Sequence, residues 1–138
     1  MDHDVKDLTL VTDFSDTDDQ CTIKINGRSL IQGTYNNQKG TLTIQSVNDR
    51  SEIVLKGRCS RVVIEYLDGQ SFIDLFALQV GDGGLLINYM NGQCRVRCQT
   101  TGQINVRDSG GQCTVFYVSP NQPIGNLKDD SRFVPLNP

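Results

Sequence analysis

The sequence predicts an all-β fold, and three observations lead to that prediction. Apolar and polar residues alternate along most of the chain, as in Ile104-Asn105-Val106-Arg107, instead of recurring every three or four positions. β-Branched residues are dense, as in Val62-Val63-Ile64. Turn dipeptides that contain glycine, such as Asp68-Gly69 and Asn91-Gly92, interrupt these segments at short intervals. The pattern is that of short strands joined by tight turns.

Length, charge and hydropathy argue against several classes of protein. The chain has 138 residues, a formal net charge of −3 and no tryptophan, so we expect one domain with its own core. It has no apolar run of about 18 residues and no basic-then-apolar start, so we expect neither a membrane span nor export. The acidic balance disfavours nucleic-acid binding. Five cysteines, an odd number, indicate reduced thiols and a cytoplasmic location.

Acidic residues and prolines are concentrated at opposite ends of the chain. Residues 1–20 carry seven of the 16 acidic residues, and we expect them to form an acidic N-terminal lead that caps the fold. Residues 21–118 carry the strand pattern and are predicted to form one repeat domain. All four prolines lie in residues 119–138, which predicts an irregular C-terminal tail.

The middle segment contains an internal repeat. Residues 66–73 align with residues 89–96 at an offset of 23, and only Phe72 and Arg95 differ in character. Residues 46–53 align 20 positions earlier, and residues 109–115 align 19 positions after the second copy. A more degraded copy at residues 23–31 requires a shortened turn. Five copies at this spacing indicate a repeat architecture.

Equivalent positions of the copies form columns of similar residues. Two β-branched columns are predicted to face the interior: Ile25, Ile44, Ile64, Ile87 and Val106, then Ile31, Ile53, Ile73, Val96 and Val115. Small side chains precede the second column by two positions: Ser29, Ser51, Ser71, Cys94 and Cys113. A polar file lies beside the turn, and its amides can hydrogen-bond along a sheet: Arg50, Gln70, Gln93 and Gln112.

Two architectures accommodate these columns. In a parallel β-solenoid each copy is one coil, and equivalent residues stack at the strand spacing. In the alternative, each copy is an antiparallel β-hairpin, and the hairpins form a sandwich or barrel. Only the solenoid explains why the small residues and the glutamines recur at one register. We therefore predict a single-stranded parallel β-helix of about five coils of 19–23 residues with terminal capping segments.

The coil length and stacking columns of residues 21–118 resemble the parallel β-helix class in general. That class includes pectin-lyase-like enzymes, the actin-binding domain of cyclase-associated proteins and bactofilin filaments. The resemblance implies the fold, and no motif assigns the chain to one family, so no functional residue is carried over.

Four features of the sequence suggest a binding or reactive site, but each also has a purely structural interpretation. Residues 13–19 hold four carboxylates, which suit Ca²⁺, but a solvated acidic lead is the favoured interpretation. Residues 81–84 lengthen one repeat and are predicted to form a plain loop, with a binding rim as the alternative. Cys94 and Cys113 are expected to be structural thiols. Cys59, among Lys56, Arg58 and Arg61, is predicted to be an oxidisable surface thiol.

Alternation places several large apolar side chains on the outside, where they mark an interface or lie under the tail of the chain. The predicted interaction surface combines them with three charged residues: Phe72, Phe76, Phe116, Leu67, Met90, Asp74, Arg95 and Arg97. Val63 is also predicted to face outward.

The sequence favours a non-enzymatic structural or protein-interaction module that self-associates or binds another protein. It indicates no catalytic residue, cofactor or metal. The alternative is a small β-helix protein that binds or acts on a glycan along a sheet face with Asp74, Glu65, Arg97 and Arg107. A third option, nucleic-acid binding, is disfavoured by the net charge.

Overall fold

Over the residues that the structure describes, eleven strands form one sheet that winds into a coil, and the all-β prediction is confirmed. The computed structural model describes residues 2–6, 9–14 and 19–136. Within those ranges there is no helix, and every pair of strands is parallel. Parallel pairing between successive copies makes a β-solenoid of about five turns and excludes the array of hairpins.

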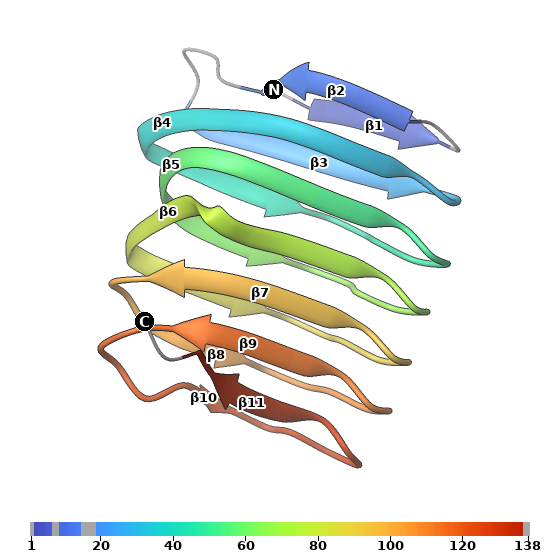
Figure 1. The fold of residues 1–138 in the computed structure, drawn as a ribbon, viewed down its shortest axis with the longest axis vertical. Coiled ribbons are helices and arrows are strands. Elements are labelled where there is room, and N and C mark those ends of the chain that lie inside the picture. The colour runs from blue at the N-terminus through green and yellow to red at the C-terminus, as the bar shows by residue number, and fades with distance from the viewer. Residues whose placement is uncertain (1, 7–8, 15–18, 137–138) are drawn as a thin grey trace.

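The strands divide between two faces, which meet at a tight edge and at a rounded edge (Figure 1). In chain order they are β1 (Asp2–Lys6), β2 (Thr9–Asp13), β3 (Gln20–Asn26), β4 (Leu30–Ile44), β5 (Glu52–Ile64), β6 (Phe72–Ile87), β7 (Arg95–Thr100), β8 (Ile104–Val106), β9 (Thr114–Val118), β10 (Ile124–Gly125) and β11 (Arg132–Pro135). Strands β4, β5 and β6 are long because each follows the first face, bends around the rounded edge and returns along the second face. The first face also holds β2, β7, β9 and β11, and the second holds β1, β3, β8 and β10.

The predicted interior columns are confirmed on both faces apart from the first coil. On the first face the column consists of neighbours in register that are fully buried: Ile31, Ile53, Ile73, Val96 and Val115. On the second face the equivalent column is Ile44, Ile64, Ile87 and Val106. Stacking of β-branched side chains at every level forms one continuous core.

The prediction for the first coil is wrong by two residues. Ile23, not Ile25, lies beside Ile44, because pairing of Gln20–Ile23 with Thr41–Ile44 sets the register there. Ile25 has the same parity as Ile23, so its side chain is buried as well. The turn is therefore one residue shorter than in the next coil, and the missing residue falls between Ile23 and Gly27, which has the left-handed φ of 77°.

Each turn at the tight edge contains one residue in the left-handed backbone conformation. Gly69, Gly92 and Gly111 have φ of 78°, 80° and 70°, and Asp49 occupies the same position one coil earlier with φ of 61°. Successive turns stack so closely that a Cβ on Gly92 would lie 2.4 Å from the carbonyl oxygen of Gly69. At Gly92, glycine is favoured by both the positive φ angle and the close approach of the backbone.

The column of small residues hydrogen-bonds the carbonyl groups of the turns. The Oγ of Ser51 lies 2.9 Å from the carbonyl oxygen of Gly27 and 3.0 Å from that of Asn48, and it accepts the amide hydrogen of Ser29 at 3.0 Å. Cys94 has the same role in a later coil, with its Sγ 3.2 Å from the carbonyl oxygen of Asn91. Four of the five positions therefore carry a small side chain that donates a hydrogen bond: Ser51, Ser71, Cys94 and Cys113. Within the described residues, the buried Oγ of Ser29 has no hydrogen-bond partner.

The glutamine ladder is present as predicted. The Nε2 of Gln70 donates to the Oε1 of Gln93 at 3.1 Å, and the Nε2 of Gln93 donates to the Oε1 of Gln112 at 3.2 Å. Like residues can form such a chain only when equivalent positions of neighbouring coils lie side by side, as they do in a parallel solenoid.

The loop predicted at residues 81–84 is wrong, because β6 continues through these residues as a strand. Relative to β5, the extra residues of this coil appear as two register shifts, one between Val54 and Lys56 and one between Cys59 and Arg61. Such bulges bend a strand and interrupt its ladder only locally, so pairing resumes on the far side of each shift. The irregular coil therefore changes the shape of the rounded edge instead of extending a loop.

Strands extend the ladder beyond residues 21–118 at both ends. β1 pairs with β3 and β2 with β4, while β10 pairs with β8 and β11 with β9. Phe133 lies beside Val115, and the Oγ of Ser131 accepts the amide hydrogen of Cys113 at 3.2 Å. The tail up to residue 136 therefore continues the interior and small-residue columns, and it is more regular than its prolines indicated.

Candidate functional site

Six of the eight predicted surface residues come together on the first face, over β6, β7 and β9. Register places Phe72 beside Arg95, and Asp74 beside Arg97, which in turn lies beside Phe116. Phe76 follows on β6. We call these six residues the arginine–aromatic face. The three phenylalanines are half-buried, and Arg95 is exposed.

Both arginines of this face lie over aromatic rings. The Cζ of Arg95 is 4.7 Å from the ring centroid of Phe72, and the Cζ of Arg97 is 4.3 Å from that of Phe76. Arg97 also forms a salt bridge with Asp74, with 3.7 Å between Nη1 and Oδ2. The other carboxylate oxygen of Asp74 accepts the amide hydrogen of Phe76 at 3.0 Å. Stacking of this kind contributes about 0.5–1 kcal/mol at an exposed site, so it positions the guanidinium groups more than it stabilises the fold.

Leu67 and Met90 do not belong to this surface, contrary to the prediction. Both are fully buried, and they form a column of single bridges with Val47 and Ser109 near the tight edge. Alternation fails here because the strand ends at Ile64, after which the chain bends and two successive residues face outward. Strict parity holds only within a strand.

A pair of stacked tyrosines replaces them on the surface of the tight edge. The rings of Tyr66 and Tyr89 lie 5.5 Å apart, and Tyr66 is 41% exposed. The hydroxyl of Tyr66 donates to Oδ2 of Asp68 at 3.0 Å, and this hydrogen bond raises the pKa of Tyr66. The sequence carried a signal for this pair, since both tyrosines occupy the same position of the repeat.

The glycan site suggested by the sequence is not assembled on one face. Asp74 and Arg97 lie on the first face, whereas Glu65 and Arg107 follow β5 and β8 at the end of the second face. Asp74 is also engaged by Arg97 and by the amide of Phe76. The four residues therefore do not form a single groove.

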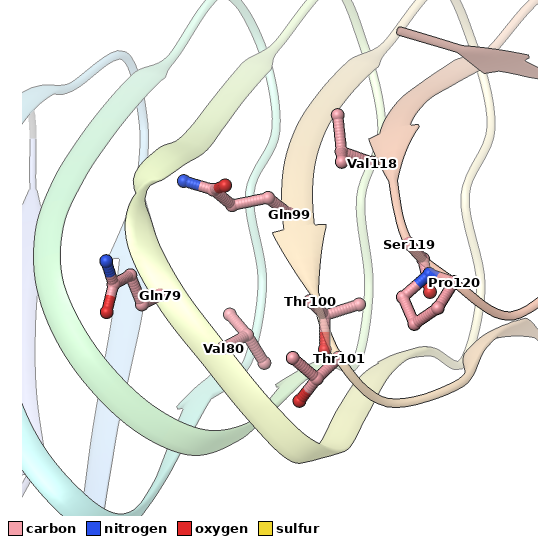
Figure 2. A pocket seen from close by; sticks show the side chains of 8 residues that line it. All are labelled: Gln79, Val80, Gln99, Thr100, Thr101, Val118, Ser119 and Pro120. Carbon is pink, nitrogen blue, oxygen red and sulfur yellow. The ribbon is translucent and has the colours of Figure 1, made fainter. Parts of the chain in front are cut away.

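A polar groove lies instead along the rounded edge (Figure 2). One hollow of about 310 Å³ is lined by side chains from β6, β7 and the segment after β9, among them Gln79, Gln99 and Ser119. A second hollow of about 450 Å³ extends to β5 and β4 and includes Arg58 and Asp82. The two hollows share Gln79, Val80 and Thr101, so we treat them as one feature and call it the edge groove.

Internal hydrogen bonds fix part of the groove wall. The Oγ1 of Thr101 donates to Oδ1 of Asp82 at 2.7 Å, and the Oγ1 of Thr100 donates to the carbonyl oxygen of Gly81 at 2.9 Å. Gln99 extends from β7 toward β6, where its amide nitrogen donates to the carbonyl oxygen of Phe76 (Figure 2). The bulges of β6 thus create the groove, and the next coil holds it in place.

Burial removes the reactivity predicted for the cysteine near three basic residues. Cys59 is 1% exposed, and burial raises the pKa of its thiol to about 12. All five cysteines are buried, and none of them forms a disulfide bond. Burial also raises the pKa of Cys98 to about 12. The prediction of an oxidisable surface thiol at Cys59 is therefore wrong, because its side chain points into the core.

Metal binding finds no support in the part of the chain that the structure describes. That part contains no group of three or more His, Cys, Asp or Glu residues arranged to hold an ion. Residues 15–18, the centre of the acidic segment considered for calcium, lie outside the described residues. Of the flanking acids, Asp19 accepts a hydrogen bond from the Nδ2 of Asn37 at 3.3 Å.

Comparison with known proteins yields no relative. No family model, no curated protein and no solved structure matches the chain. Over the described residues, no helix has the length and apolar character needed to cross a bilayer. The functional argument therefore depends on the geometry of the arginine–aromatic face and of the edge groove.

Proposed function

We propose that this chain is a non-enzymatic structural or protein-interaction module that self-associates through the arginine–aromatic face. The observation that supports the proposal is the cluster of three half-buried phenylalanines with two arginines stacked beside them. Aromatic and arginine side chains are enriched in protein interfaces, and arginine is enriched among the few residues that dominate the binding energy. Stacking also holds the guanidinium groups in place, so less side-chain entropy is lost on association.

The charges of this face suit a second copy of the same chain. Glu52 and Asp74 lie in the same rows as Arg95 and Arg97, so the face carries both signs within a few residues. A two-fold axis brings the same patch of both subunits together, and it can place the acidic residues of one copy against the basic residues of the other. We also propose a cytoplasmic location, since five buried cysteines that form no disulfide bond suit a reducing compartment.

Sedimentation velocity at increasing protein concentration tests the proposal. We expect the wild type to dimerise between about 10 µM and 1 mM, and Arg95→Glu to weaken dimerisation by roughly tenfold or more. Arg107→Glu makes the same change of charge at an exposed position on the other face and should leave dimerisation unchanged. A wild type that stays monomeric throughout, or equal behaviour of the two variants, would contradict the proposal.

A further inference from the structure

The geometry points to a second function for the edge groove, which we infer is a binding site for a linear, hydroxyl-rich ligand of the neutral oligosaccharide class. This inference goes beyond self-association and does not depend on it. The groove lies at the rounded edge and shares no residue with the arginine–aromatic face.

The groove is elongated in the direction of the solenoid axis. Its lining comes from five successive levels, namely β4, β5, β6, β7 and the residues that follow β9. Four steps of about 4.8 Å between neighbouring strands give a length of about 19 Å. Hollows of about 310 and 450 Å³ fall within the usual range of ligand pockets, so several linked sugar units fit better than one compact molecule.

The lining side chains match hydroxyl groups in chemistry. Gln38, Gln79 and Thr101 carry groups that both donate and accept hydrogen bonds, as a sugar hydroxyl does. Val118, which is half-buried, and Pro120, which is exposed, supply apolar surface for the C–H groups of a sugar ring. The charged side chains, Arg58 and Asp82, have opposite signs, so the groove favours a neutral ligand over a phosphate or a polyanion.

Several of these polar groups have hydrogen-bonding capacity to spare. Within the described residues, the side chain of Gln79 makes no hydrogen bond and is exposed. The bond from Gln99 to Phe76 uses its amide nitrogen and leaves Oε1 as an acceptor. The bond from Thr101 orients Asp82 and leaves its second carboxylate oxygen as an acceptor. A ligand can thus bind without first breaking the contacts that hold the wall.

An extended peptide fits this groove less well than a sugar chain. Peptides that bind to β-proteins usually pair with the backbone of an open strand edge. Where β6 borders the groove, its residues Gln79 and Val80 are already paired with Gln99 and Thr100 of β7. Side-chain amides and hydroxyls therefore make up the accessible polar surface.

Titration by two-dimensional NMR with three neutral trisaccharides tests the inference. The probes are maltotriose, cellotriose and N,N′,N″-triacetylchitotriose, each raised to about 10 mM because shallow polar sites bind weakly. We expect at least one probe to shift the side-chain amide signals of Gln79 and Gln99 saturably, together with the backbone signal of Thr101. The side-chain amides of the glutamine ladder at the tight edge should not move.

Matched variants locate the binding. Gln79→Leu removes an exposed amide that makes no internal bond, so it should fold normally and lower the affinity roughly tenfold. Gln45→Leu makes the same change at an exposed position outside the groove and should bind like the wild type. The inference is overturned if no probe shifts the groove signals, if Gln79→Leu binds normally, or if a neutral pentapeptide competes equally well. Because the dimer face is elsewhere, these outcomes are independent of the dimerisation assay.

Discussion

At the scale of single residues, burial determines the pKa of Cys59, and the basic residues next to it in the sequence do not. Lys56, Arg58 and Arg61 surround Cys59 in the sequence, and such cations lower a thiol pKa when they face it. On a strand, however, the side chain of Cys59 points into the core while its neighbours point toward solvent. Burial then disfavours the thiolate and raises the pKa of Cys59 to about 12.

The raised pKa of Cys59 makes stability fall in alkali. Because the unfolded thiol has a pKa of 9.0 and the folded one about 12, its contribution is complete below about pH 9 and is lost as the pH rises toward 12. We expect the free energy of unfolding to drop by roughly 1–2 kcal/mol from this residue between about pH 9 and 10.5. Denaturant unfolding of the wild type and of Cys59→Val measures the difference.

Valine is the matched substitution because Val80 occupies the equivalent position of the next coil. Ile53→Val serves as a control, since it alters the core without removing a titratable group. Stability curves of the wild type and of Cys59→Val that run parallel from about pH 8 to 10.5 would contradict the assignment.

The turns at the tight edge are the elements that repeat most faithfully. The turns at residues 49–51, 69–71, 92–94 and 111–113 each combine a left-handed residue, a small hydrogen-bonding side chain and a polar residue of the adjacent file. Because the amide hydrogen of Ser29 is buried and its partner is the Oγ of the next coil, the bond couples two levels of the solenoid. Residues at the turns therefore stabilise the contact between neighbouring coils as well as the turn itself.

Ser51→Ala should destabilise the fold by about 1–3 kcal/mol, because it leaves the buried amide of Ser29 without a partner. Ser51→Cys should cost less, since cysteine fills the same position at Cys94 and Cys113. Chemical denaturation provides the measurement, and Ser60→Ala, at a half-buried serine of β5, is the control. If alanine at positions 51 and 60 lowers the free energy of unfolding equally, the column requires only a small side chain and not its hydrogen bond.

At the scale of the whole molecule, the described part of the solenoid has a strand edge at each end. An unpaired strand edge can pair with another chain, and two features of the C-terminal edge disfavour such pairing. Its strands, β10 and β11, have two and four residues. Arg132 and Leu136 donate their amide hydrogens inward, to Cys113 and Tyr117, so Pro135 lies at an outward-facing position where it has no hydrogen to donate.

Pro135→Thr should therefore promote end-to-end association by restoring a donor on the open edge. We expect species larger than a dimer in sedimentation velocity, with an increase in their fraction as concentration rises. Arg132→Thr changes a residue of the same strand whose amide already points inward, and it should have no such effect. Unchanged sedimentation of Pro135→Thr would indicate that the missing donor does not protect this end.

Several parts of the candidate site were accessible to sequence analysis. Phe72, Asp74, Arg95 and Arg97 stand at repeat positions inside strands, where a period of two fixes the side of every residue. Leu67 and Met90 were misplaced because they lie beyond a strand end, where that period no longer holds. The edge groove gave no signal, because a register shift between Leu75 and Gln79 of β6 places Gln79 beside Gln99. The repeat offset of 23 aligns Gln79 with Gly102 instead.

The sequence by itself determined the parallel solenoid, the interior columns and the glutamine ladder, because stacking requires like residues at one register in every coil. Tertiary structure alone decided where copies depart from the repeat. It placed the first coil two residues from its predicted register, carried β6 through the glycines at 81–84, and continued the stack into the tail. The physical reason is that register is set by cooperative pairing along whole strands, so extra or missing residues are absorbed wherever bending costs least.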